Sequence, residues 1–369
     1  MRIKILDAVY KSSKFQPGTF MKRLFWSIIF LILLSNAGWI KGQTAPDAAA
    51  QTGKATADDR DAAQLLLKQG KTNEAIALLQ KNVDQKAADP SVNFLLGKAF
   101  YAQMKYQAAI DRLTISVREL PKTAPEYREA VQMLGLANYL SGRLAEAIPF
   151  LEQLSGWSPN NTEISYALGV SYVQTRQPAK SREIFARLFK VPANSAAACL
   201  LNAQMLVKQQ FEETAEIELN KALELDPKLP QTHFVLGELA IYRADLDQGI
   251  EYLQKEIELN PAFAMAHYRL GEALTRQLKW DEAIAPLQKS IWLNPFFSGP
   301  YIVLGKVYLK KNDSVTAENM LRHAVAIDPR NFSAHHLLAQ ALQQAGKTDE
   351  AKKEFILAEQ LRGTNEKEK

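Results

Sequence analysis

The feature that most constrains the fold of this chain is a short phrase that returns every 34 residues. The segment Leu223–Pro227 reads LELDP, and near-copies end at Pro261, Pro295 and Pro329, each 34 residues after the one before. A fixed period of this length indicates an array of stacked structural units, in which each unit buries its apolar face against its neighbours.

Each unit carries the hydrophobic period of two amphipathic helices. Apolar residues recur three and four positions apart from Met265 to Gln277, and again from Asp281 to Leu293. This is the period of a helix and not of a strand. The repeated phrase then marks the end of the second helix, because its apolar last turn is followed by Asp or Asn and by a Pro that cannot continue the helix.

Small residues indicate a fixed crossing point between the paired helices. One repeat position holds glycine in six units, at Gly97, Gly135, Gly169, Gly237, Gly271 and Gly305. Glycine inside a helix costs about 1 kcal/mol relative to alanine, so its repetition needs an offsetting gain. We expect the partner helix to pack closely against this position, with small residues such as Ala283 serving the same crossing from the second helix.

These positions resemble the tetratricopeptide repeat family. The resemblance rests on the LELDP-like endings, the Leu-Gly pairs and the small residue that opens the second helix, and it implies an all-α, right-handed superhelical solenoid of about nine helix-turn-helix repeats over residues 56–365. In that register the units are 56–89, 90–123, 128–161, 162–195, 196–229, 230–263, 264–297, 298–331 and 332–365. Residues 366–369 are a charged tail.

Four extra residues separate the second and third units. Around them, Thr123–Glu126 has the form of a capping box with Pro125 in the first turn. We expect one added turn at the front of the third unit's first helix, with the stack locally offset there.

The beginning of the chain is a different kind of sequence. Met21–Arg23 is basic and precedes the apolar run Leu24–Leu34, after which small residues follow. This order predicts a signal peptide over residues 21–42, cleaved after Ala37 or Gly42. Residues 1–20 precede a second Met that opens this signal, so we expect translation to begin at Met21 and the upstream stretch to be a mis-assigned start; the alternative is a cytoplasmic tail on an anchored protein. Residues 43–55 fit a flexible linker.

Export would place the array in the periplasm or outside the cell. The alternative is a signal anchor facing the periplasm, because Trp39 and Ile40 extend an apolar run that is otherwise short for a membrane span. The membrane is a partner only in that case.

The basic charge of the chain belongs to the leader. Residues 1–42 hold seven Lys and Arg against one Asp, whereas the remainder holds 38 basic and 39 acidic residues. A nearly neutral array has no electrostatic footprint for nucleic acid, and we expect no nucleic-acid partner.

Motifs that suggest chemistry have simpler structural explanations. Gly70-Lys71-Thr72 and Gly346-Lys347-Thr348 lack the earlier glycine of a phosphate loop and fall at turns, where Gly takes the left-handed conformation. His233, His267 and His335 share one repeat position, too far apart for one metal ion. We expect no enzyme activity, no cofactor and no metal site.

The resemblance implies that the first helices line a concave groove that binds a protein partner. Groove positions of the family correspond here to Tyr166, Leu200, Phe234, Glu238, Tyr242, Tyr268, Glu272, Arg276 and Ile302. An exposed apolar and aromatic stripe favours a protein or peptide partner, although aromatics at these positions also pack against the next unit.

The function expected from this resemblance is that of a non-catalytic scaffold, exported from the cytoplasm, that binds a peptide or helical segment. The alternative is a membrane-anchored assembly subunit of an envelope secretion or polysaccharide-export machine.

Overall fold

The computed structural model describes residues 57–83 and 89–367, so the predicted signal peptide, the upstream segment and the linker lie outside the described residues. Within these ranges every regular element is a helix. The helices are α3 (Ala57–Lys68), α4 (Thr72–Val83), α5 (Pro90–Ala102), α6 (Tyr106–Glu119), α7 (Pro125–Leu140), α8 (Leu144–Trp157), α9 (Thr162–Gln174), α10 (Pro178–Leu188), α11 (Ala196–Lys208), α12 (Glu212–Leu225), α13 (Thr232–Tyr242), α14 (Leu246–Leu259), α15 (Ala264–Arg276), α16 (Trp280–Leu293), α17 (Ser298–Lys310), α18 (Ser314–Ile327), α19 (Phe332–Gln344) and α20 (Thr348–Lys367).

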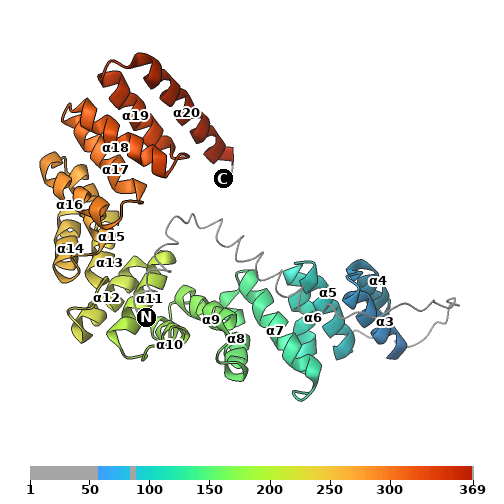
Figure 1. Cartoon of the computed structure of the whole chain (residues 1–369). Helices are drawn as coiled ribbons and strands as arrows, with labels where there is room; N and C mark the ends of the chain where they lie inside the picture. Colours follow the sequence, from blue (N-terminus) through green and yellow to red (C-terminus); the bar gives the residue numbers. More distant parts are fainter. Residues whose placement is uncertain (1–56, 84–88, 368–369) are drawn as a thin grey trace. The chain divides into compact units, whose positions relative to one another are not determined.

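The helices follow one another as stacked pairs, and each predicted unit contains one pair (Figure 1). Consecutive helices pack against each other throughout the described array. Most first helices also contact the first helix of the next unit, as α15 contacts α17 and α17 contacts α19. This arrangement confirms the predicted all-α solenoid and sets the first helices in a row.

The repeated phrase ends the second helices as predicted. The residues before the four prolines are the C-caps of α12, α14, α16 and α18, namely Asp226, Asn260, Asn294 and Asp328. In each case the backbone N–H of the cap donates to a carbonyl four residues earlier, at 2.7–2.9 Å. The proline that follows then directs the chain into the next first helix.

The repeated glycines lie at the crossings of the paired helices. A Cβ atom added at Gly97, Gly271 or Gly305 would come within 2.5 Å of the Cγ atom of the leucine opposite. At Gly237 the corresponding distance to Leu253 Cγ is 3.1 Å. At Gly135 and Gly169 the neighbours are Phe150 and Phe185, at 3.0 and 2.6 Å. The small residues opposite, such as Ala283, are fully buried, so both helices contribute to a close approach.

The turn inside each pair adopts the left-handed conformation at one residue. Glycine fills this position at Gly70, Gly142 and Gly346, with φ between 75° and 79°. Six other residues adopt the same conformation with φ between 57° and 65°: Met104, Arg176, Gln210, Ala244, Leu278 and Asn312. Both Gly-Lys-Thr triplets therefore sit at these turns, as predicted.

The insertion between the second and third units lengthens α7. This helix begins at Pro125 and has 16 residues, whereas α9, α11 and α15 have 13. The added turn is therefore correct. The capping box is wrong, because the N-cap is Ala124 and no side chain caps the helix. Pro125 at the first helical position lacks an N–H, so the helix start has one fewer unsatisfied donor.

Helix α13 begins later in its unit than its neighbours do. Its N-cap residue Gln231 has φ 72° and makes no side-chain cap. The carboxylate of Glu256, fully buried in α14, takes that role by accepting hydrogen bonds from the backbone N–H groups of Gln231 at 2.8 Å and Phe234 at 3.3 Å. Burial raises the pKa of Glu256, while these backbone hydrogen bonds oppose the shift.

The end of the array differs slightly from the prediction. Helix α20 continues to Lys367, two residues into the segment that the sequence assigned to the charged tail.

Among the described residues no helix is both long and apolar enough to cross a bilayer.

Candidate functional site

The predicted groove residues lie on the row of first helices. Tyr166 is on α9 and Leu200 on α11; α13, α15 and α17 carry the others. We call the side of α13, α15 and α17 that bears Glu238, Tyr242, Tyr268, Glu272, Arg276, Ile302, Lys306 and Lys310 the first-helix face. Neighbouring helices of this group are in contact, so these positions follow one another from unit to unit.

Two of the predicted groove residues are buried. Leu200 and Phe234 are 3% and 1% exposed. Phe234 packs edge to face against Phe263, with 5.0 Å between the ring centroids. The sequence left two roles open for these side chains, binding a partner in the groove or packing between helices. Their burial indicates packing, so the predicted groove role of Leu200 and Phe234 is corrected.

A second aromatic pair, one unit further along, remains half-buried. Tyr268 packs edge to face against Phe297, with ring centroids 4.9 Å apart. Burial raises the pKa of Tyr268 to about 12, and the negative charge of Glu272 adds to the shift. Because edge-to-face aromatic pairs are stabilised beyond their burial, the two rings form a rigid apolar surface.

Gly299 lies directly against this aromatic pair. A Cβ atom at Gly299 would lie 2.7 Å from Cζ of Phe297 and 3.2 Å from Cε2 of Tyr268. Any other residue would displace the rings. Phe296, next to the pair in sequence, is 85% exposed, and Ile302 is half-buried.

The two predicted acidic residues are joined by one arginine. Arg269 donates from Nη1 to Glu272 Oε2 at 2.7 Å and from Nη2 to Glu238 Oε2 at 3.0 Å. Burial disfavours the charge of Arg269, but both carboxylates favour it, and its pKa is raised. Burial also raises the pKa of Glu238, against the opposing effect of Arg269. Neither acid is free to bind a cationic partner.

The far ends of the first helices carry exposed side chains. Tyr242 is 74% exposed at the end of α13, and Arg276 is exposed at the end of α15. Within residues 57–83 and 89–367 Arg276 forms no ion pair. Tyr166 is half-buried, and burial raises its pKa. The open part of the predicted set therefore comprises Tyr166, Tyr242, Tyr268, Arg276 and Ile302.

Sequence reasoning missed Arg269, Phe297 and Gly299. Arg269 directly follows the groove residue Tyr268. The signal that could have indicated its role is the pair of carboxylates, Glu238 and Glu272, at the same repeat position in two successive units. Phe263 and Phe297 are 34 residues apart, and so are their ring partners Phe234 and Tyr268. This shared 34-residue spacing could have indicated Phe297 from the sequence.

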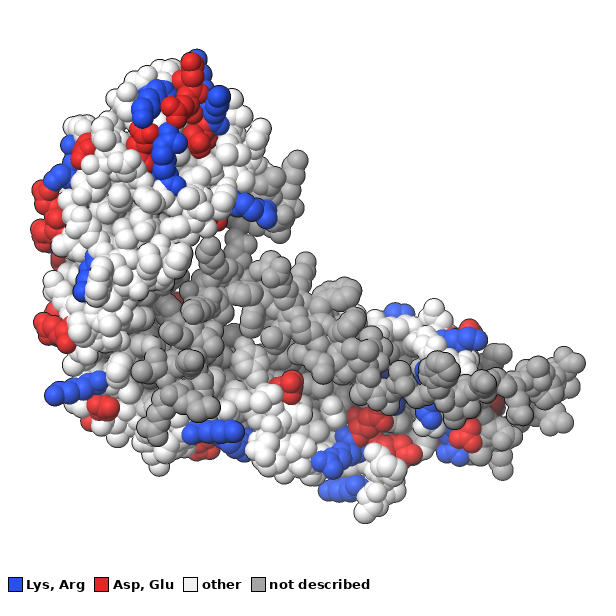
Figure 2. All heavy atoms as spheres, in the orientation of Figure 1, with Lys and Arg blue, Asp and Glu red and all other residues white. Residues whose placement is uncertain are grey.

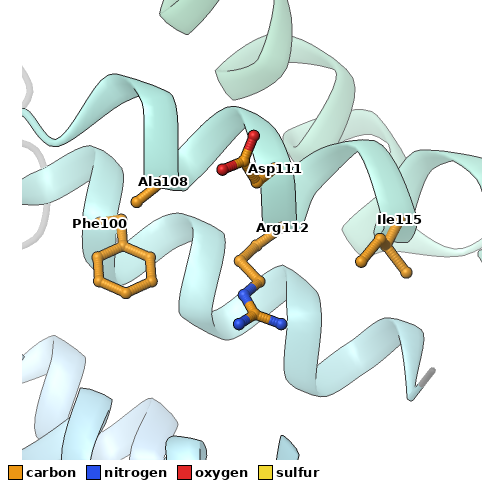
Figure 3. Close-up of a pocket in the computed structure, with 5 residues that line it drawn as sticks. All are labelled: Phe100, Ala108, Asp111, Arg112 and Ile115. Atoms are coloured by element: carbon orange, nitrogen blue, oxygen red, sulfur yellow. The ribbon is translucent and has the colours of Figure 1, made fainter. Parts of the chain in front are cut away.

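A small hollow lies elsewhere, between α5 and α6 (Figure 3). It measures about 210 Å³ and is lined by Phe100, Ala108, Asp111, Arg112 and Ile115. Arg112 donates to Asn93 Oδ1 at 3.4 Å. None of the predicted groove residues lines this hollow, and it belongs to another part of the array.

Two of the three histidines that share a repeat position, His267 and His335, stabilise turns. His267 Nε2–H donates to the carbonyl of Pro261 at 3.0 Å, and His335 Nε2–H donates to that of Pro329 at 3.0 Å. Each histidine therefore ties its helix to the proline of the preceding repeated phrase. In the described part of the chain no three His, Cys, Asp or Glu side chains are grouped to hold a metal ion.

Charge is mixed over the visible face of the array. Figure 2 shows acidic and basic side chains interspersed there, with no broad area of one sign. Recognition by a local cluster of side chains is more consistent with this surface than long-range attraction to a polyanion.

Comparisons with known proteins agree with the repeat pattern. Two family models, both described as tetratricopeptide repeat, match the chain, one over residues 139–205 and 308–360 and the other over 60–121, 94–160 and 234–295. A search of curated protein sequences finds no match.

Similar solved structures include a crystal structure of MamA, which is 27% identical, with a TM-score of 0.42 over 45% of this chain and 96% of that one. MamA 41-end from Desulfovibrio magneticus RS-1 is 20% identical, with a TM-score of 0.43 over 46% and 96%. The APC/C hetero-tetramer Cut9-Hcn1 is 18% identical, with a TM-score of 0.41 over 73% and 52%.

Proposed function

The chain belongs to the tetratricopeptide repeat family, whose members typically bind protein partners, and from this premise we propose that it is a non-catalytic, exported scaffold that binds a peptide or helical segment of a protein partner. The binding surface is the first-helix face. The observation that carries the proposal is the half-buried aromatic pair Tyr268–Phe297 together with the exposed ring of Tyr242 at the far end of α13.

Aromatic side chains suit such a surface. They supply a large contact area at a low cost in conformational entropy, and they are enriched at the residues that dominate binding energy. The exposed surface of the Tyr242 ring does not stabilise the fold, because apolar surface stabilises a protein only when it is removed from water, by about 25 cal/mol per Å². A partner that covers Tyr242 would gain this energy.

Site-specific photo-crosslinking tests the location. A photoreactive residue is placed at Tyr242, and a matched one at Ile217, which is 56% exposed on the second helix α12. We expect a discrete cross-linked protein in cells from position 242 and none from position 217. Equal cross-linking at both positions, or none at 242, would contradict the proposed surface.

The proposal of export rests on the basic residues Lys22 and Arg23, which follow Met21, and on the apolar run Leu24–Leu34. We expect the mature chain to begin at Gly38 or Gln43 and to be recovered in a soluble, non-cytoplasmic fraction. Intact-mass measurement of the protein from cells decides this, and residues 1–20 found on the mature chain would contradict cleavage.

The extension of this apolar run by Trp39 and Ile40 is the feature behind the second candidate, a membrane-anchored assembly subunit of an envelope secretion or polysaccharide-export machine. Retention of residues 21–42 in a membrane fraction is the result that would favour it. In both cases the first-helix face is the proposed binding surface, so the two candidates differ in location and not in the site.

A further inference from the structure

Helix α20 packs on α19 through one of its sides. This inner side carries Ala351, Phe355 and Ala358, which are spaced i, i+4 and i+7 along the helix. Both alanines are buried, and the ring of Phe355 packs edge to face against that of His336 on α19, with 5.4 Å between the ring centroids. These contacts hold α20 against the array, and several side chains on its other sides are exposed.

Two neighbouring residues of α20, Ile356 and Leu357, are apolar where earlier units are polar. Ile356 is 60% exposed and Leu357 37%. The corresponding pairs in the fifth to eighth units are Asn220-Lys221, Gln254-Lys255, Gln288-Lys289 and Arg322-His323. All of these polar side chains are exposed, although another unit follows each of them. Apolar residues at these two positions are therefore not needed for packing one unit on the next, and a polar outer face would favour solubility.

Charged residues flank Ile356 in a self-complementary order. Lys352, Ile356 and Glu359 are spaced i, i+4 and i+7, so they lie on one side of α20, and all three are exposed. If a second copy of α20 lies antiparallel to the first, with Ile356 against Ile356, each Lys352 is opposite Glu359 of the other copy. A parallel alignment would instead bring like charges together. The order of charge along this side therefore fits an antiparallel copy of the same helix.

We propose that α20 binds a second copy of this chain, with the two α20 helices antiparallel and related by a two-fold axis at Ile356. Pairing removes the exposed surface of Ile356 from water and forms two Lys352–Glu359 ion pairs between the copies. A two-fold interface uses the same patch of both molecules, as this order of charge requires, and the opposite charges fix its register. Helix α20 is not part of the first-helix face, so a dimer presents that face twice.

Cysteine cross-linking in cells tests the pairing on the chain as the cell produces it. Ile356→Cys places a thiol at the expected axis, and a short bis-maleimide joins two such thiols only when they are close together. The native Cys199 is buried, and the matched control is Val315→Cys, at a site 68% exposed on α18. We expect a product of twice the mass of the chain from position 356, in which the peptide around this position is joined to itself, and no such product from position 315.

Charge reversal tests the antiparallel register in the Ile356→Cys chain. Lys352→Glu sets two acids opposite each other at both ends of the contact, and Glu359→Lys sets two lysines there. We expect either change alone to lower the yield of cross-linked dimer at least about fivefold, and the two changes together to restore it. The control is Lys228→Glu, an exposed residue after α12, which changes the net charge as Lys352→Glu does and should leave the yield unchanged.

Analytical ultracentrifugation of the chain without substitutions measures the same pairing. We expect the mass of two chains at about 100 μM and a growing fraction of single chains on dilution, whereas Ile356→Asp should sediment as a single folded chain.

Three results would overturn the pairing. A single chain at every concentration up to about 100 μM, or no self-joined peptide from position 356, would reject a second copy as the partner. Dimer yields that ignore both charge reversals would reject the antiparallel register. Cross-linking of position 356 to another protein in place of a second copy would assign this side of α20 to a different partner and reject the dimer. Photo-crosslinking at Tyr242 decides the proposed function separately in each case.

Discussion

Replacing Gly271 by Ala tests whether close helix contact explains the repeated glycines. A Cβ atom at this position would lie 2.5 Å from Cγ and 2.7 Å from Cδ2 of Leu287, and 3.3 Å from the carbonyl oxygen of Ala283. Carbon atoms in a packed interior are best separated by about 3.5–4.0 Å. Leu287 is fully buried, so neither it nor the helix can move away without disturbing other contacts.

The magnitude follows from two opposing effects. Overpacking a core typically costs about 1–3 kcal/mol, whereas Ala in place of Gly inside a helix gains about 1 kcal/mol. We therefore expect Gly271→Ala to lower the free energy of unfolding by about 0–2 kcal/mol. The control is Gly156→Ala in α8, because Gly156 is exposed and a Cβ atom there would meet nothing within 4 Å. That variant should gain up to about 1 kcal/mol.

Urea unfolding followed by circular dichroism compares the two variants. Repeat arrays depart from two-state unfolding, so the shift of the transition is compared between variants rather than converted to one absolute stability. A double variant with Leu287→Ala tests the contact itself, since removing Leu287 relieves the clash and the two changes should be less than additive. An equal gain in stability for Gly271→Ala and Gly156→Ala would refute close packing as the reason for the glycine.

Further predictions concern a turn, a buried cap and an ion pair. Leu278→Gly should raise the stability to urea by up to about 1 kcal/mol, because Leu278 has φ 63° and is 66% exposed; an unchanged or lower midpoint would contradict strain at this turn. Burial raises the pKa of Glu256, so the stability that its protonated form contributes is fully present below the pKa of the unfolded chain and is lost as pH rises through the folded pKa. Unfolding measured from about pH 4 to 7 should therefore show the stability of Glu256→Gln increasing relative to that of the parent chain as pH rises. The opposite trend would disprove the shift. Arg269→Met should cost about 1 kcal/mol, less at high salt, because it leaves Glu238 and Glu272 unpaired; a salt-independent change in urea midpoint would argue against the ion pairs.

Much of the fold could be predicted because a few positions of the repeat accept only a few residue types. Gly271 and Ala283 allow the paired helices to approach closely, and the Asn-Pro ending of the unit stops the second helix. Their spacing therefore predicted the helices, the crossing and the turn. The added turn of α7 was predicted for the same reason, since Pro125 suits the first position of a helix.

Features that depend on a neighbour's side chain were harder to predict. Phe234 and Tyr268 occupy the same repeat position, yet Phe234 is buried and Tyr268 is half-open. The pairing of Glu238 and Glu272 with Arg269 likewise depends on packing between two units. The left-handed turn at Leu278 carries no glycine signal, because packing of the two helices imposes a conformation that Leu does not favour.

The central claim is that a protein partner binds the first-helix face, and one triple variant tests it most directly. Tyr242, Arg276 and Lys310 occupy the same repeat position in three successive units, and all three are exposed. We predict that replacing all three by Ala leaves the thermal melt within a few degrees of the parent chain, because little buried contact is lost, and abolishes partner cross-linking quantified by mass spectrometry from intact cells. Undiminished cross-linking in a folded triple variant would contradict the claim.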